Sequence, residues 1–79
     1  FGIYSLKMNQ KEFVFIFAVN QQEAIQFYRD TFFANPLNCH EYPLDFQIDR
    51  GDAAISFREM RKEFLNLPAI AGFYERESY

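Results

Sequence analysis

Cysteine, histidine and glycine are scarce in this chain, and each scarcity removes a class of function. The 79 residues include one cysteine, one histidine and three glycines. A lone cysteine, Cys39, cannot form a disulfide within the chain, so a disulfide-stapled fold is excluded and a reducing compartment is favoured. The glycines at positions 2, 51 and 72 are too far apart to form a glycine-rich phosphate loop. With no cofactor fingerprint in the sequence, we predict no cofactor.

The residues best suited to metal binding or covalent chemistry are adjacent in the chain, as Cys39, His40 and Glu41. Metal ligands are usually spaced by about two to four positions, with a second pair elsewhere, and this chain has no second cysteine or histidine. We therefore predict no metal site. A nucleophile and its base must lie within hydrogen-bond reach, which neighbouring side chains rarely achieve. We predict no catalytic residue, and an enzyme built around Cys39, His40 and Asp45 ranks last among the hypotheses.

Charge and hydropathy argue against two further classes of protein. The formal net charge is −3 and the calculated pI is about 5.0, whereas general nucleic-acid binders carry a basic excess. Nucleic acid is therefore a disfavoured partner. No apolar run approaches the roughly 20 residues that a membrane helix needs, and no basic segment leads into an apolar stretch with a small-residue cleavage site. We expect a cytoplasmic protein with no membrane partner.

The apolar run 13–19 predicts a central β-strand. Its β-branched and aromatic residues favour a strand over a helix. Side chains alternate along a strand, so one face carries Phe13, Phe15, Phe17 and Val19, and the other carries Val14, Ile16 and Ala18. A strand that is apolar on both faces should be central in its sheet, with something packed on each side.

Polar signals predict the elements around this strand. Residues 1–8 alternate as a first strand, and Asn9-Gln10 predicts a tight hairpin into the central strand. Asn20 starts a helix over residues 21–33 through a capping box with Glu23. Asn35-Pro36 ends that helix.

The second half of the chain gives weaker signals. Residues 34–43 are predicted to be irregular, and residues 44–48 alternate as a half-buried strand. Residues 53–57 fit either a returning strand or the start of a helix, and the helix is favoured because Ser56 begins a second capping box. Residues 68–76 are predicted to form the last strand.

These elements predict a single compact α+β domain over residues 1–79, in the order ββαβαβ. We expect a mostly antiparallel sheet of about four strands with two helices packed on it, and the strand order stays open. If both helices cover the same face, the second apolar face of the central strand remains exposed. A second copy of the chain would then be the simplest cover, so we predict a homodimer.

The abundance of aromatic residues, 20% of the chain, predicts a surface for a protein partner in addition to a core. The candidate partner-binding residues are Phe13, Phe15, Phe17, Phe73, Tyr74 and Tyr79. The leading hypothesis is a small non-enzymatic protein–protein interaction module that associates with itself, such as the adaptor or inhibitor-like accessory proteins of bacteria.

The alternative hypothesis is a weak nucleic-acid-binding protein. Arg58, Arg61 and Lys62 lie within one turn of each other on the second predicted helix and share a face. Such a face can contact phosphate groups. The interleaved Glu59 and Glu63 favour an ion-paired, solvated face instead.

Overall fold

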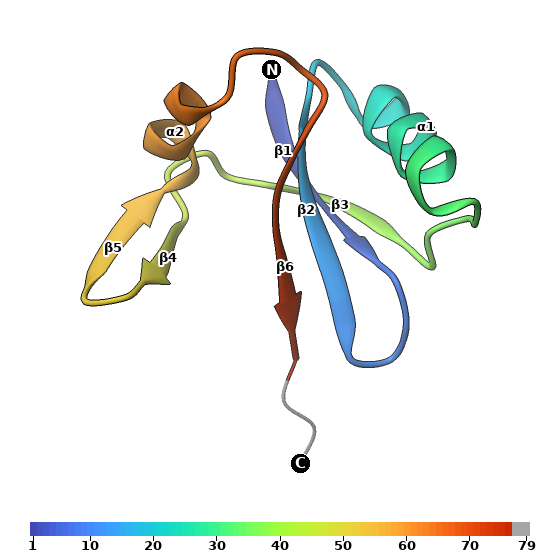
Figure 1. Cartoon of the computed structure of the whole chain (residues 1–79), viewed down its shortest axis with the longest axis horizontal. Helices are drawn as coiled ribbons and strands as arrows, with labels where there is room; N and C mark the ends of the chain where they lie inside the picture. The colour runs from blue at the N-terminus through green and yellow to red at the C-terminus, as the bar shows by residue number, and fades with distance from the viewer. Residues whose placement is uncertain (77–79) are drawn as a thin grey trace.

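The apolar strand β2 (Glu12–Ala18) lies inside the sheet and has an antiparallel neighbour on each side. In the computed structural model, which describes residues 1–76, these neighbours are β1 (Gly2–Lys7) and β6 (Ala69–Glu75). A fourth strand, β3 (Cys39–Tyr42), pairs with β1, and the sheet has the order β3-β1-β2-β6 (Figure 1). The predicted α+β class with a four-stranded antiparallel sheet is confirmed, and β3 and β6 form its edges.

A side chain closes the turn between β1 and β2. The Oδ1 atom of Asn9 accepts hydrogen bonds from the backbone N–H groups of Lys11 and Glu12, both at 2.9 Å. Asparagine is common in turns because its short side chain bonds to the backbone two residues on. The predicted hairpin therefore forms without glycine in the turn.

Helix α1 (Gln21–Phe32) begins at the predicted cap. Asn20 Oδ1 accepts the backbone N–H of Glu23 at 2.8 Å. The carboxylate of Glu23 accepts the N–H of Val19 at 3.0 Å, one residue before the N–H group that a capping box predicts. The helix ends at Phe33, which has the left-handed conformation with φ 56° and ψ 37°.

The second half of the chain forms a separate hairpin and a short helix. Strands β4 (Gln47–Arg50) and β5 (Ala53–Ser56) pair only with each other, and α2 (Phe57–Met60) follows directly and continues as the 3₁₀ turn η1 (Arg61–Glu63). The side chain of Ser56 accepts the N–H of Glu59 at 3.2 Å, as the capping box predicts.

Three predictions for this half are corrected by the structure. Residues 53–56 are a strand and the helix starts at Phe57, so each of the two alternatives for 53–57 describes part of the segment. Residues 44–46 form a turn closed by the Phe46 N–H to the Pro43 carbonyl at 3.1 Å, which delays the strand to Gln47. The segment 34–43, predicted to be irregular, contains β3.

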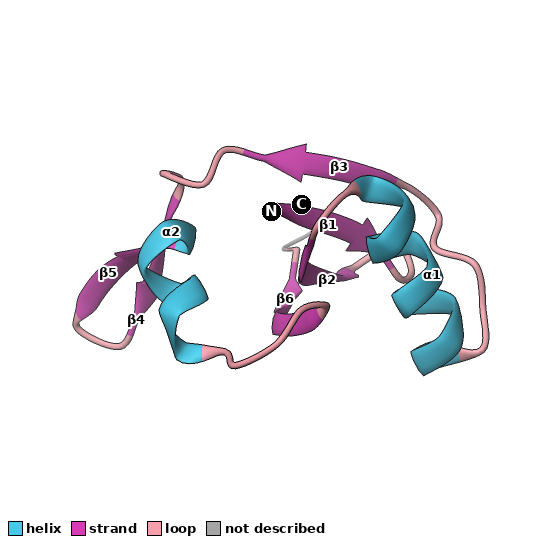
Figure 2. Ribbon diagram, turned by 90° about the horizontal axis from the view of Figure 1, so that it is seen from above, coloured by secondary structure: helices cyan, strands magenta, loops and turns pink. Residues whose placement is uncertain are grey.

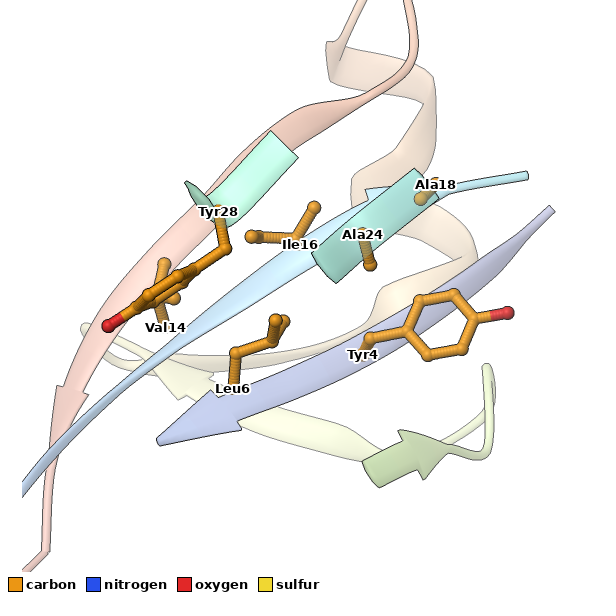
Figure 3. Packing of buried hydrophobic residues seen from close by; sticks show 7 residues of the cluster. All are labelled: Tyr4, Leu6, Val14, Ile16, Ala18, Ala24 and Tyr28. Carbon is orange, nitrogen blue, oxygen red and sulfur yellow. The ribbon is translucent and has the colours of Figure 1, made fainter. Parts of the chain in front are cut away.

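The two helices lie on opposite faces of the sheet (Figure 2). Helix α1 covers the face of Val14, Ile16 and Ala18 (Figure 3). On the other face, Phe57 and Met60 of α2 pack with Ile3, Phe15 and Phe17. Each apolar face of β2 thus has a helix of the same chain packed on it, which removes the reason given above for a second copy as cover.

None of the helices within residues 1–76 is long and apolar enough to cross a membrane.

We predict that Phe57 is required for α2 to pack on the sheet, because a helix as short as α2 is stable only through tertiary packing. The Phe57 ring is fully buried, with centroids 4.7 Å from Phe15 and 6.1 Å from Phe17. Phe57→Ala should lower the free energy of unfolding by about 3–5 kcal/mol, out of the roughly 4–12 kcal/mol expected for a chain of this length. Urea unfolding followed by circular dichroism measures the change.

The matched control is Leu65→Ala, because the Leu65 side chain is 96% exposed. Its free energy of unfolding should stay within about 0.5 kcal/mol of the parent value. Equal unfolding midpoints for the two variants would contradict the assignment of Phe57 to the core.

Candidate functional site

The basic residues of the second helix do not form a surface of unpaired charge. Arg58 Nε donates to Asp45 Oδ1 at 2.9 Å, and this bond lowers the pKa of the Asp45 carboxyl. Lys62 Nζ lies 3.4 Å from the Glu59 carboxylate. Two of the three cations predicted to contact nucleic acid are therefore ion-paired within the chain, in agreement with the ion-paired interpretation of this face.

The third cation, Arg61, is folded onto the protein. Its Nη1 atom donates to the Phe64 carbonyl at 2.8 Å, and its guanidinium carbon lies 5.4 Å from the ring centroid of Phe1. Glu63, predicted to interleave with the basic residues, pairs instead with Arg50 of β4 at 2.6 Å, and this hydrogen bond lowers the pKa of the Glu63 carboxyl. These contacts join η1 to Phe64, to the first residue of the chain and to β4.

The Cys39-His40-Glu41 segment lies on β3, where alternation separates neighbouring side chains. Cys39 packs against the α1 side of the sheet, opposite Leu6, whereas His40 is the partner of Ser5 and faces the other side. Cys39 and His40 therefore cannot act together as nucleophile and base. Within residues 1–76, no three His, Cys, Asp or Glu side chains are grouped as a metal site would require.

The six aromatic residues predicted to bind a partner fall into different environments. Phe15 and Phe17 are only 3% and 0% exposed beneath α2, so their assignment to a partner surface is corrected. Phe13 and Tyr74 are half-buried and stack on each other, with ring centroids 6.1 Å apart. Phe73 is 59% exposed. The sixth residue, Tyr79, lies outside the described residues.

At the end of α1, the half-buried Phe32 contacts the exposed Phe73 of the edge strand β6. The ring of Phe32 rests edge-on against Phe73, with centroids 6.1 Å apart. The next residue, Phe33, is 91% exposed. We refer to Phe32, Phe33 and Phe73 as the aromatic edge patch. Phe32 and Phe33 were absent from the predicted partner set, and the only sequence signal for them was the general excess of phenylalanine.

A second surface lies on the opposite face of the sheet, where a hollow of about 580 Å³ borders the ends of β1 and β2. Helix α2 packs on Phe15 and Phe17, and the hollow begins beyond them, over Ser5, Lys7 and Phe13. We refer to this surface as the open half-sheet. It also includes residues from β3 and from the turn before β2, among them His40, Tyr42 and Lys11.

Comparison with known proteins does not point to either surface. No family model matches the chain, and searches of curated proteins and of solved structures returned no match. The aromatic edge patch and the open half-sheet are therefore interpreted from their own residues.

We predict that Cys39 is a slow nucleophile. Burial raises the pKa of its thiol, an effect that the nearby Gln21 amide partly offsets. Because the thiolate is the reactive form, each unit of increase in pKa slows modification at neutral pH by about tenfold. The native protein should react with a chromogenic disulfide more slowly than the urea-unfolded protein, and its rate should rise with pH at a higher midpoint. A native rate equal to the unfolded rate would contradict this.

Proposed function

We propose that this chain is a non-enzymatic interaction module that acts through protein–protein contact, first with a second copy of itself, as a small adaptor or inhibitor-like accessory protein would. The observation that carries the proposal is Phe33, an aromatic residue exposed in a strained conformation at the end of α1. Separation of Cys39 and His40 onto opposite faces of β3 supports a non-enzymatic role.

Phe33 is unfavourable in the isolated chain in two respects. Its φ of 56° belongs to the left-handed region, where a residue other than glycine loses about 1–2 kcal/mol. This position after a helix is usually glycine or asparagine. Its ring is also 91% exposed, so it contributes little to the core. Strained residues concentrate at binding sites, and burial of the ring against a partner would offset both costs.

The neighbouring edge strand supports a second copy as that partner. Strand β6 has seven residues, of which only Glu75 is charged, and its outer edge has no strand beside it within residues 1–76. The other edge, β3, is shorter and carries His40 and Glu41. Unpaired edges that are long and apolar tend to pair with other strands.

An antiparallel strand is complementary to itself under two-fold symmetry. A pairing of β6 with its copy, centred on Phe73, places the two Phe73 rings directly opposite each other on the α1 face. The bulge at Ala71, which has no partner in β2, bends the start of β6 and confines this pairing to the segment from Gly72 onward.

We predict that the chain is a dimer in light scattering over a micromolar concentration series and that two substitutions weaken it. Phe73→Lys should raise the dissociation constant by at least about tenfold, because it removes an interface ring and adds a charge to the edge. Phe33→Gly should also weaken association, while its free energy of unfolding stays the same or rises by up to about 1 kcal/mol as the backbone strain is relieved.

The matched control is Leu65→Lys, an exposed apolar residue in the loop before β6. It should leave the dissociation constant unchanged. A parent chain that stays monomeric throughout the series, or a dimer equally strong in all three variants, would overturn the proposal. The unfolding measurement on Phe33→Gly separates a weakened interface from a damaged fold.

A further inference from the structure

The register of the sheet assigns a defined set of side chains to the open half-sheet. Ile3 and Phe17 are register partners and face α2. Alternation then puts Ser5 and Lys7 of β1 on this same face. Lys7 pairs with Phe13, and Ser5 pairs with His40 of β3. Residues from three strands therefore meet on one uncovered surface.

Three basic side chains border this surface. Lys7, Lys11 and Arg76 all border the hollow, and the N–H of Arg76 bonds to the Lys11 carbonyl at 2.6 Å, which holds these two residues side by side. None of the three forms an ion pair with a carboxylate among residues 1–76. The positive charge is local, because the whole chain has a net charge of −3.

Two carboxylates, Glu12 and Glu75, also line the hollow. Glu12 and Glu75 are register partners, and alternation places both on the α1 face with Val14 and Phe73. Glu12 also accepts a hydrogen bond from the Asn9 amide at 2.8 Å, which holds it at the hairpin turn. Three basic residues and two acidic residues therefore line the hollow, which leaves a small local excess of positive charge.

Two aromatic rings border the same hollow, and each packs against Phe15. Phe13 is half-buried, packs edge-on against Phe15 at a centroid distance of 5.5 Å and stacks on Tyr74. Tyr42 borders the other side of the hollow and packs edge-on against Phe15 at 4.9 Å. Because these contacts restrict the rings before binding, little conformational entropy is lost when a flat ligand stacks on them.

Single-strand recognition combines aromatic rings with basic side chains. This surface has fixed rings beside lysine and arginine side chains that form no ion pair among residues 1–76. The basic groups contact phosphates, and the rings stack on bases, which are accessible in a single strand but hidden in a duplex. We propose that the open half-sheet binds single-stranded nucleic acid. This site differs from the helix surface of Arg58, Arg61 and Lys62, and it does not depend on the proposed dimer.

The experiment is fluorescence anisotropy with labelled single strands, DNA and RNA, of about 12 nucleotides, a length suited to a surface of this size. The parent chain should bind, and the logarithm of its association constant should fall against the logarithm of salt concentration with a slope of about −2, as expected for three phosphate contacts on a single strand. Whether DNA or RNA binds more tightly identifies the preferred form. No salt-dependent binding to either strand would overturn the proposal.

Single substitutions distinguish the contribution of the basic side chains from that of base stacking on the aromatic rings. Lys11→Gln, in the exposed turn, should weaken binding and make the slope shallower by about 0.7, the contribution of one contact. Phe13→Leu, which keeps an apolar side chain over Phe15, should weaken binding by about tenfold without changing the slope. The matched control is Lys62→Gln on η1, which should leave both quantities unchanged. An effect of Lys62→Gln equal to that of Lys11→Gln would overturn the assignment to the open half-sheet.

Two further ligands test whether bases are recognised. Inorganic polyphosphate and a duplex of the same sequence supply phosphate charge without accessible base faces, and both should bind more weakly than the single strand. Equal binding of polyphosphate, together with no effect of Phe13→Leu, would show a general anion site and overturn the proposal. Urea unfolding of each variant checks its fold, and Lys11→Gln, at an exposed position, keeps the test decisive if Phe13→Leu is unstable.

Discussion

The structure depends on the need to bury both faces of β2. The face toward α1 carries small and branched side chains, which allow the helix to pack close to the sheet. The other face carries phenylalanine rings, which need a large apolar side chain packed over them. Phe57 supplies that side chain, but α2 and η1 together have only seven residues. The layer formed by α2 and η1 is therefore too short to cover the sheet as far as the hairpin between β1 and β2. The open half-sheet is the region that α2 and η1 leave uncovered, and there the strands carry polar and basic side chains. The need to cover both faces of β2 therefore explains the core as well as the open half-sheet.

Sequence patterns predicted the elements whose signals are local. Asn20 and Ser56 marked both helix starts, because a cap depends on a side chain and a backbone group three residues away. Strand β3 was missed because an edge strand paired on one side needs little apolar character. The placement of the helices on one face or on both was left open by the sequence. Backbone hydrogen bonds from Phe57 to Phe46 and from Arg58 to Leu44 help to fix α2, and no local sequence pattern indicates them.

The same contrast applies to the candidate sites. Arg58, Arg61 and Lys62 are close in sequence and were therefore noticed, yet folding pairs or covers each of them. Lys7 and Lys11 lie on either side of the first hairpin turn, and Arg76, distant in sequence, joins them only because β6 pairs with β2. Phe33 was predicted to lie within the first helix, but its left-handed backbone and its exposure could not be inferred from residue type, because both depend on where the helix ends. A site whose residues come together only through the pairing of distant strands cannot be recognised from a single sequence.

The position of β6 beside β2 has a consequence for how the chain folds. Strand β2 can pair with β1 and receive α1 through contacts between near neighbours in sequence, which form quickly. The phenylalanine face of β2 is covered by residues that follow after a long interval of chain, among them Phe57 and Met60, and β6 pairs with β2 after a still longer interval. Loop closure over such distances is slow. A newly synthesised chain therefore passes through a stage in which Phe15 and Phe17 are exposed to solvent, and this stage is when the chain is most prone to aggregate.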